Sequence, residues 1–177
     1  MRSLAKLTSL AFALAPIAAQ AAEPPCLSSA EFTALSSYAL PSIITGTTER
    51  CATTLPADAW LRRNGSQLAA RYAVAKPAAW PTAKAAFLKL GGNSTNAEAS
   101  NLLKSLPDSS LQPMLDALIS GMVGQQLPAE RCGVIDRLVR LLAPLPPENT
   151  AELIAVAAGL GAKTGRAKVG SFSICPA

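Results

Sequence analysis

The cysteines are the residues of this chain whose type and spacing say most about its chemistry. The sequence contains four cysteines and no histidine. No two cysteines form a Cys-x-x-Cys pair, which argues against thioredoxin-type redox chemistry. Their long spacings and the lack of histidine also argue against a zinc site. We therefore interpret all four as members of two structural disulfides: Cys26, Cys51, Cys132 and Cys175.

The pairing of these cysteines is not fixed by the sequence, because four cysteines allow three connectivities. We favour Cys26–Cys51 together with Cys132–Cys175, since each bond then joins neighbours along the chain. A chain-entropy model gives each such bond about 3–4 kcal/mol of stabilisation. In this arrangement the second bond also holds the C-terminal tail onto the preceding helices.

Patterns for catalysis are weak in this sequence. There is no Gly-x-Ser-x-Gly turn, and no histidine is present to activate a serine hydroxyl. Glu148 and Glu152 are one helical turn apart, but acids in a first turn ordinarily stabilise the helix N-terminus. The sequence predicts no cofactor and no metal site. It favours a protein that is not an enzyme, with an enzyme that uses carboxylates as the alternative.

Charge is sparse and dispersed along the chain. Lys and Arg number 16 against 11 Asp and Glu, for a net charge of +5, and only 15 % of the residues are charged. Soluble domains average about 25 %. The densest basic cluster is Lys163, Arg166 and Lys168, and it lacks the interleaved aromatic residues of a single-strand nucleic-acid binder. We therefore expect no nucleic-acid partner.

Residues 1–21 match a secretory signal peptide. Two basic residues precede a short apolar stretch at 7–15, and Ala-Gln-Ala at 19–21 forms a small-x-small cleavage site. The apolar stretch is too short to cross about 30 Å of hydrocarbon. We expect cleavage near Ala21 and Ala22, no transmembrane segment in the remaining chain, and a periplasmic or secreted bacterial product.

Residues 22–177 have the pattern of a single all-α domain. Ser28 and Glu31 fit a capping box, which places a helix start there. Pro41 then either opens a second helix or kinks a longer one, and Pro77 and Pro81 predict a turn. We expect a compact bundle of about six to eight short helices, held by two disulfides and followed by an extended C-terminal tail.

A set of large side chains at helical spacing marks where a pocket would lie if the bundle contains one. Aromatic residues at such spacing more often belong to a core, whereas methionines adapt well to apolar ligands. These residues are the candidate lining of a ligand pocket: Trp60, Tyr72, Trp80, Met114 and Met122.

Two functional hypotheses follow from these observations. The first is an exported, non-catalytic helical binding or interaction protein, because a cross-linked helical frame is combined with few catalytic residue types. The second is a carrier that holds a small apolar ligand or a lipid in a pocket between helices. A protein partner and an apolar small molecule are thus the two kinds of partner that the sequence suggests.

Overall fold

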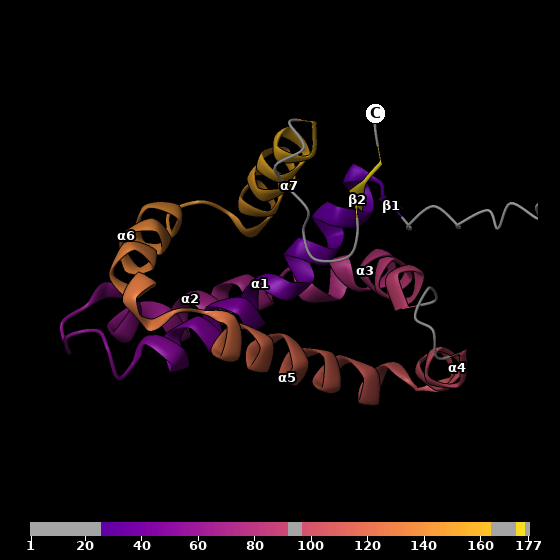
Figure 1. Ribbon diagram of the computed structural model, residues 1–177, viewed down its shortest axis with the longest axis horizontal. Helices are drawn as coiled ribbons and strands as arrows, with labels where there is room; N and C mark the ends of the chain where they lie inside the picture. The colour runs from indigo at the N-terminus through magenta and orange to yellow at the C-terminus, as the bar shows by residue number, and fades with distance from the viewer. Residues whose placement is uncertain (1–25, 92–96, 164–172, 176–177) are drawn as a thin grey trace, which may run out of the picture.

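The described residues of the computed structural model, 26–91, 97–163 and 173–175, form an all-α fold with seven α-helices, as predicted (Figure 1). One short 3-10 helix and two short strands complete it. The elements are β1 (Cys26–Leu27), α1 (Ser29–Cys51), α2 (Trp60–Ala73), α3 (Lys76–Gly91), α4 (Ala97–Ser105), α5 (Asp108–Gln126), η1 (Ala129–Arg131), α6 (Cys132–Leu142), α7 (Pro147–Lys163) and β2 (Ser173–Ile174).

Helix α1 is the element against which α2, α3, α5 and α7 all pack. It begins with the predicted capping box: the Glu31 amide donates to the Ser28 hydroxyl at 3.2 Å, and the Ser28 amide donates to the Glu31 carboxylate at 2.7 Å. Leu27 and Phe32, on either side of the cap, are buried in the same apolar cluster. These contacts form a hydrophobic staple that fixes how the chain enters α1.

Pro41 lies inside α1 and does not end it. Of the two predicted alternatives, the structure therefore has the single longer helix. A proline removes one ladder hydrogen bond and bends a helix, and α1 is bent in Figure 1. Pro81 likewise lies inside α3. The predicted turn around Trp80 is therefore wrong: Trp80 is 7 % exposed and packs on Tyr38, with ring centroids 4.9 Å apart.

Two glycines allow helices to cross α1 at short distance. A Cβ atom added at Gly46 of α1 would lie 2.5 Å from the backbone oxygen of Ser120 in α5. A Cβ atom at Gly65 of α2 would lie 2.2 Å from the Thr48 hydroxyl. Neither crossing has room for a side chain, so both glycines are required by packing. The close contact with Thr48 explains why a glycine stands in the middle of α2.

The two disulfides join residues far apart in the sequence, and the predicted pairing is wrong. Cys26 is bonded to Cys175 and Cys51 to Cys132. Cys26 precedes the 23-residue helix α1 and Cys51 ends it. At about 1.5 Å per residue their Cα atoms are separated by roughly 35 Å, whereas a disulfide needs Cα atoms less than about 7 Å apart. The uninterrupted helix therefore excludes a Cys26–Cys51 bond.

The tail is attached next to the start of α1. β2 pairs in parallel with β1, with Cys26 opposite Ser173 and Leu27 opposite Ile174. The Cys175 amide donates to the Leu27 carbonyl at 2.9 Å. Together with the Cys26–Cys175 bond these contacts fix residues 173–175, while residues 164–172 and the predicted signal peptide lie outside the described residues. None of the described helices is long and apolar enough to cross a membrane.

We predict that Gly46→Ala lowers the free energy of unfolding by about 1–3 kcal/mol, since the methyl group must displace the backbone of α5. Gly121→Ala in α5 is the matched control, because a Cβ atom there meets nothing within 4 Å. Alanine is the better helix former, so this variant should gain up to about 1 kcal/mol. Urea unfolding with intact disulfides measures both values. A neutral or stabilising Gly46→Ala would contradict the close crossing.

Candidate functional site

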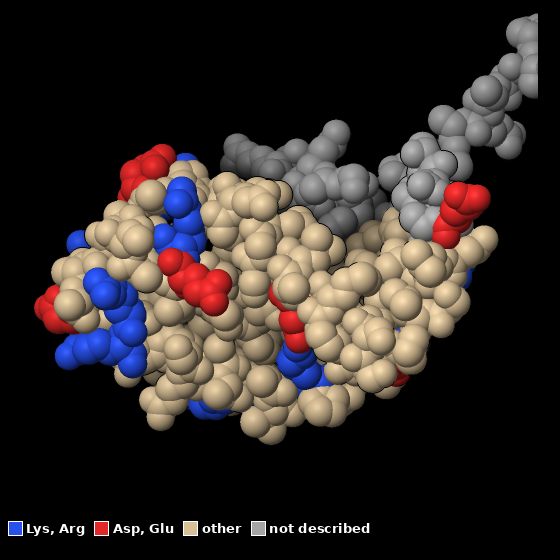
Figure 2. All heavy atoms as spheres, turned by 90° about the horizontal axis from the view of Figure 1, so that it is seen from below, with Lys and Arg blue, Asp and Glu red and all other residues tan. Residues whose placement is uncertain are grey.

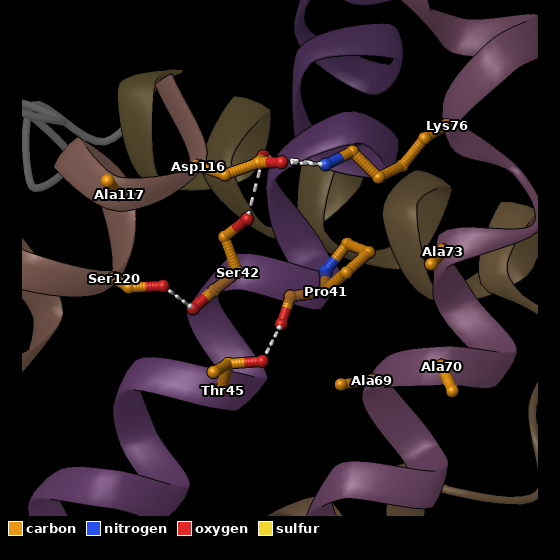
Figure 3. A pocket seen from close by; sticks show the side chains of 10 residues that line it. All are labelled: Pro41, Ser42, Thr45, Ala69, Ala70, Ala73, Lys76, Asp116, Ala117 and Ser120. Carbon is orange, nitrogen blue, oxygen red and sulfur yellow. Dashed lines mark hydrogen bonds and ion pairs between the residues drawn. The ribbon is translucent and has the colours of Figure 1, made fainter. Parts of the chain in front are cut away.

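A polar pocket of about 380 Å³ lies among α1, α2, α3 and α5 (Figure 3). Its polar side chains come from α1, α3 and α5, whereas α2 contributes alanines. The lining residues are Pro41, Ser42, Thr45, Ala69, Ala70, Ala73, Lys76, Asp116, Ala117 and Ser120. The small side chains do not fill this volume, which leaves the pocket open. The polar side chains lie at one side of it.

Asp116 is the centre of the polar contacts in this pocket. The Lys76 ammonium donates to both carboxylate oxygens, at 2.6 and 2.5 Å. The Ser42 hydroxyl, on a residue that is 6 % exposed, donates to Oδ1 at 2.9 Å. One carboxylate of α5 therefore holds a side chain of α3 and a side chain of α1 (Figure 3).

Tyr38 borders the same ion pair. The Lys76 Nζ atom lies 4.4 Å from the centroid of the Tyr38 ring, a cation–π distance. The Tyr38 hydroxyl donates to the Gln112 carbonyl at 3.3 Å. Burial, and then the negative charge of Asp116, raise the pKa of Tyr38 far above its usual value of 10.0. Tyr38 therefore stays neutral and acts as a hydrogen-bond donor between α1 and α5.

The hydroxyls of the pocket donate to backbone carbonyls or to Asp116, and none of them is paired with a free base. Ser120 donates to the Ser42 carbonyl at 3.0 Å, and Thr45 donates to the Pro41 carbonyl at 3.0 Å. An attacking serine needs a base that takes its proton, whereas the carboxylate that Ser42 contacts already holds an ammonium group. We interpret the cluster as a polar junction of three helices.

A second hollow is an apolar groove of about 540 Å³. It runs between α1 and α5, with Phe87 of α3 beside them. We use "the apolar groove" for the hollow lined by Leu35, Ala39, Ile43, Phe87, Leu115, Leu118, Ile119, Met122, Val123, Gln126 and Leu127. Gln126 is the single polar side chain among these lining residues.

The groove combines a buried floor with an exposed rim. Leu115 is 1 % exposed, whereas Ile43, Leu118 and Met122 are 37 %, 50 % and 48 % exposed. Figure 2 views the molecule from the side of α5, and uncharged side chains cover most of that face. The half-exposed apolar residues of the two adjacent helices therefore leave apolar area in contact with water.

The structure separates the five predicted pocket residues. Met122 lines the apolar groove, and Met114 is 41 % exposed on the same helix but outside the lining. Trp60 lines a different hollow of about 450 Å³ beside α2. Tyr72 is 2 % exposed, and its hydroxyl is hydrogen-bonded to the Thr150 hydroxyl at 2.7 Å. It is a core residue, as is Trp80.

The other candidate acids lie on the exposed surface of the described chain. Glu148 and Glu152 are exposed on α7, and Asp108 forms an exposed ion pair with Lys84 at 2.6 Å. Within the described part of the chain, no group of three or more Cys, Asp and Glu side chains could hold a metal ion. The basic cluster around Arg166 lies outside the described residues.

Sequence reasoning missed the α1 side of the groove and the partners of Asp116. Leu35, Ala39 and Ile43 recur at every fourth residue, which is the signal for one helix face. Because Pro41 predicts either a helix start or a kink, the sequence leaves open whether that face continues across it. Asp116 stands among apolar residues of α5, and a lone acid in such a stretch could have indicated a polar junction.

Comparison of the chain with models of known protein families, with curated proteins and with solved structures gives no match.

We predict that Asp116→Ala lowers the free energy of unfolding by about 1–3 kcal/mol, because the buried Ser42 hydroxyl and Lys76 both lose their acceptor. Asp108→Ala is the matched control, since it removes an exposed partner of Lys84. Exposed ion pairs contribute little, so this loss should be much smaller. Equal losses in urea unfolding would show that the Asp116 junction is no stronger than a surface ion pair.

Proposed function

We propose that this protein is an exported, non-catalytic binding protein and that it carries a small apolar ligand, such as a lipid chain, in the apolar groove. The observation that carries the proposal is the lining of that groove. Ten of its eleven lining residues have apolar side chains, and they come from α1, α3, α5 and the residue that caps the end of α5.

The size and the chemistry of the groove support an apolar ligand. Small-molecule sites are commonly about 300–1,000 Å³ in volume and mostly apolar, and the groove measures about 540 Å³. A hydrocarbon chain needs no hydrogen-bond donors, and the groove has few to give. The half-exposed rim residues Leu118 and Met122 would lose contact with water when a chain lies over them.

Export is supported by two separate features. Two disulfides within one chain are typical of an oxidising, extracellular compartment. The leader pattern at 1–21 supports transport by a secretory route. A carrier in that compartment would keep an apolar molecule in solution between two membranes or between a membrane and the medium.

A protein partner in the same groove is the second hypothesis. An amphipathic helix could place apolar residues against the Leu118 and Met122 rim in the way that helix-in-groove complexes do. The two hypotheses predict different bound molecules in protein that is purified from its own host. A lipid-sized mass bound in native mass spectrometry supports the carrier, and a protein that carries no such mass contradicts it.

We predict that the protein binds palmitate, used as a probe of one apolar chain, and that Leu118→Gln with Met122→Gln weakens this binding at least about tenfold. The two glutamines keep the size of the side chains but make the rim polar. Isothermal titration calorimetry measures the affinities.

Leu102→Gln is the matched control, because Leu102 is 63 % exposed on α4 and does not line the groove. It should leave the affinity for palmitate unchanged. No binding of palmitate by the folded protein, or equal weakening by the rim and control variants, would contradict the carrier.

A further inference from the structure

Helix α6 exposes a row of apolar side chains that lies outside the apolar groove. Val134, Leu138 and Leu141 are 69 %, 53 % and 75 % exposed. Their spacings of four and three residues place them along one edge of the helix. Val139, on the neighbouring side of α6, packs against two apolar clusters of the core. We call Val134, Leu138 and Leu141 the outer edge of α6.

The outer edge lies at the end of the molecule where the arginines gather. Charged side chains cluster at this end of the face shown in Figure 2. Every arginine that the structure describes belongs to the last turn of α1, to α2, to η1 or to α6. These are Arg50, Arg62, Arg63, Arg71, Arg131, Arg137 and Arg140.

The arginines of this end are exposed, and the ion pairs among the described residues do not use them. All three of those ion pairs are formed by lysines of α3. Arg137 is three residues from Val134 and four from Leu141, so it is next to both on the helix surface. Arg140 is exposed three residues after Arg137, further round the helix from Leu138. A guanidinium beside an apolar edge suits a phosphate headgroup above hydrocarbon.

The acid of α6 is directed into the protein. The Leu61 amide donates to Asp136 Oδ1 at 2.6 Å. This contact caps the start of α2, whose own N-cap residue Ala59 has no side-chain hydrogen bond. Asp136 is therefore engaged with α2, and none of the ion pairs among the described residues joins it to Arg137 or Arg140. The remaining acids of this end, Glu49, Asp58 and Glu130, are fewer than its arginines.

We infer that the outer edge of α6, together with Arg137 and Arg140, docks this protein on the surface of a membrane that contains anionic phospholipids. The edge is a convex helix ridge with apolar side chains, which can enter the headgroup region while the arginines contact phosphates. A purely apolar partner surface would offer no negative charge to these arginines. The occupant favoured by the charge is therefore an anionic lipid surface, and an acidic protein is the competing outcome.

The test is sedimentation of the oxidised, folded protein with vesicles of phosphatidylcholine that contain phosphatidylglycerol. Binding is expected with these vesicles at low salt and much less with pure phosphatidylcholine. Leu138→Ala with Leu141→Ala should weaken the partition about tenfold, since two apolar side chains are removed from the interface. Arg137→Gln with Arg140→Gln should also weaken the partition about tenfold. Added salt should weaken it too, because salt screens the attraction between arginines and anionic lipids.

Two control variants make the same kinds of change, one residue at a time, on a different helix. Leu102→Ala removes an exposed leucine, and Lys104→Gln removes an exposed cation, both from α4. Both should bind vesicles as the unchanged protein does. The inference is overturned if anionic vesicles do not bind the protein, if pure phosphatidylcholine binds it equally, or if the α6 variants bind like the α4 variants. Because none of these residues lines the apolar groove, the result is independent of palmitate binding.

Discussion

The structure depends on one constraint: a single long helix is held at both of its ends by disulfides to distant parts of the chain. Cys26 precedes α1 and is bonded to Cys175, across 149 residues. Cys51 ends α1 and is bonded to Cys132, across 81 residues. A chain-entropy model gives loops of this length about 4–5 kcal/mol each. The bonds tie the tail to the start of α1 and tie α6 to its end.

This anchoring compensates for a core that is divided among small clusters. The buried residues that the structure describes form four groups arranged along α1, and alanines and glycines occupy several helix crossings. Small side chains permit close packing but bury little apolar area each. Polar contacts add connections between the clusters, as where Asp116 joins α5 to Ser42 and Lys76. The same division leaves apolar residues of α5 and α6 exposed, and these surfaces carry the two proposed binding roles.

Much of the fold could be predicted from local signals in the sequence. The capping box at Ser28, the all-α pattern and the structural role of the cysteines depend on neighbouring residues and on composition, and each is confirmed. The disulfide pairing could not be predicted, because it depends on whether Pro41 ends α1. A proline bends or ends a helix according to the packing around it, and Pro41 is buried among helices.

The candidate site could be predicted only in part for a similar reason. Periodicity identified Met114 and Met122 on one face of α5, but that face is wide, and only Met122 lines the groove. Trp60, Tyr72 and Trp80 have the spacing of buried residues whether they line a pocket or fill a core. Which face meets which helix is decided by crossings such as that of Gly46 over Ser120, which join residues far apart in the sequence.

The most direct test of this account is mass spectrometry of peptides from the non-reduced protein. The account predicts one peptide pair that joins Cys26 with Cys175 and another that joins Cys51 with Cys132. A peptide pair that joins Cys26 with Cys51 would contradict it, since the two ends of an uninterrupted α1 cannot meet. Four free thiols in the folded protein would contradict it equally.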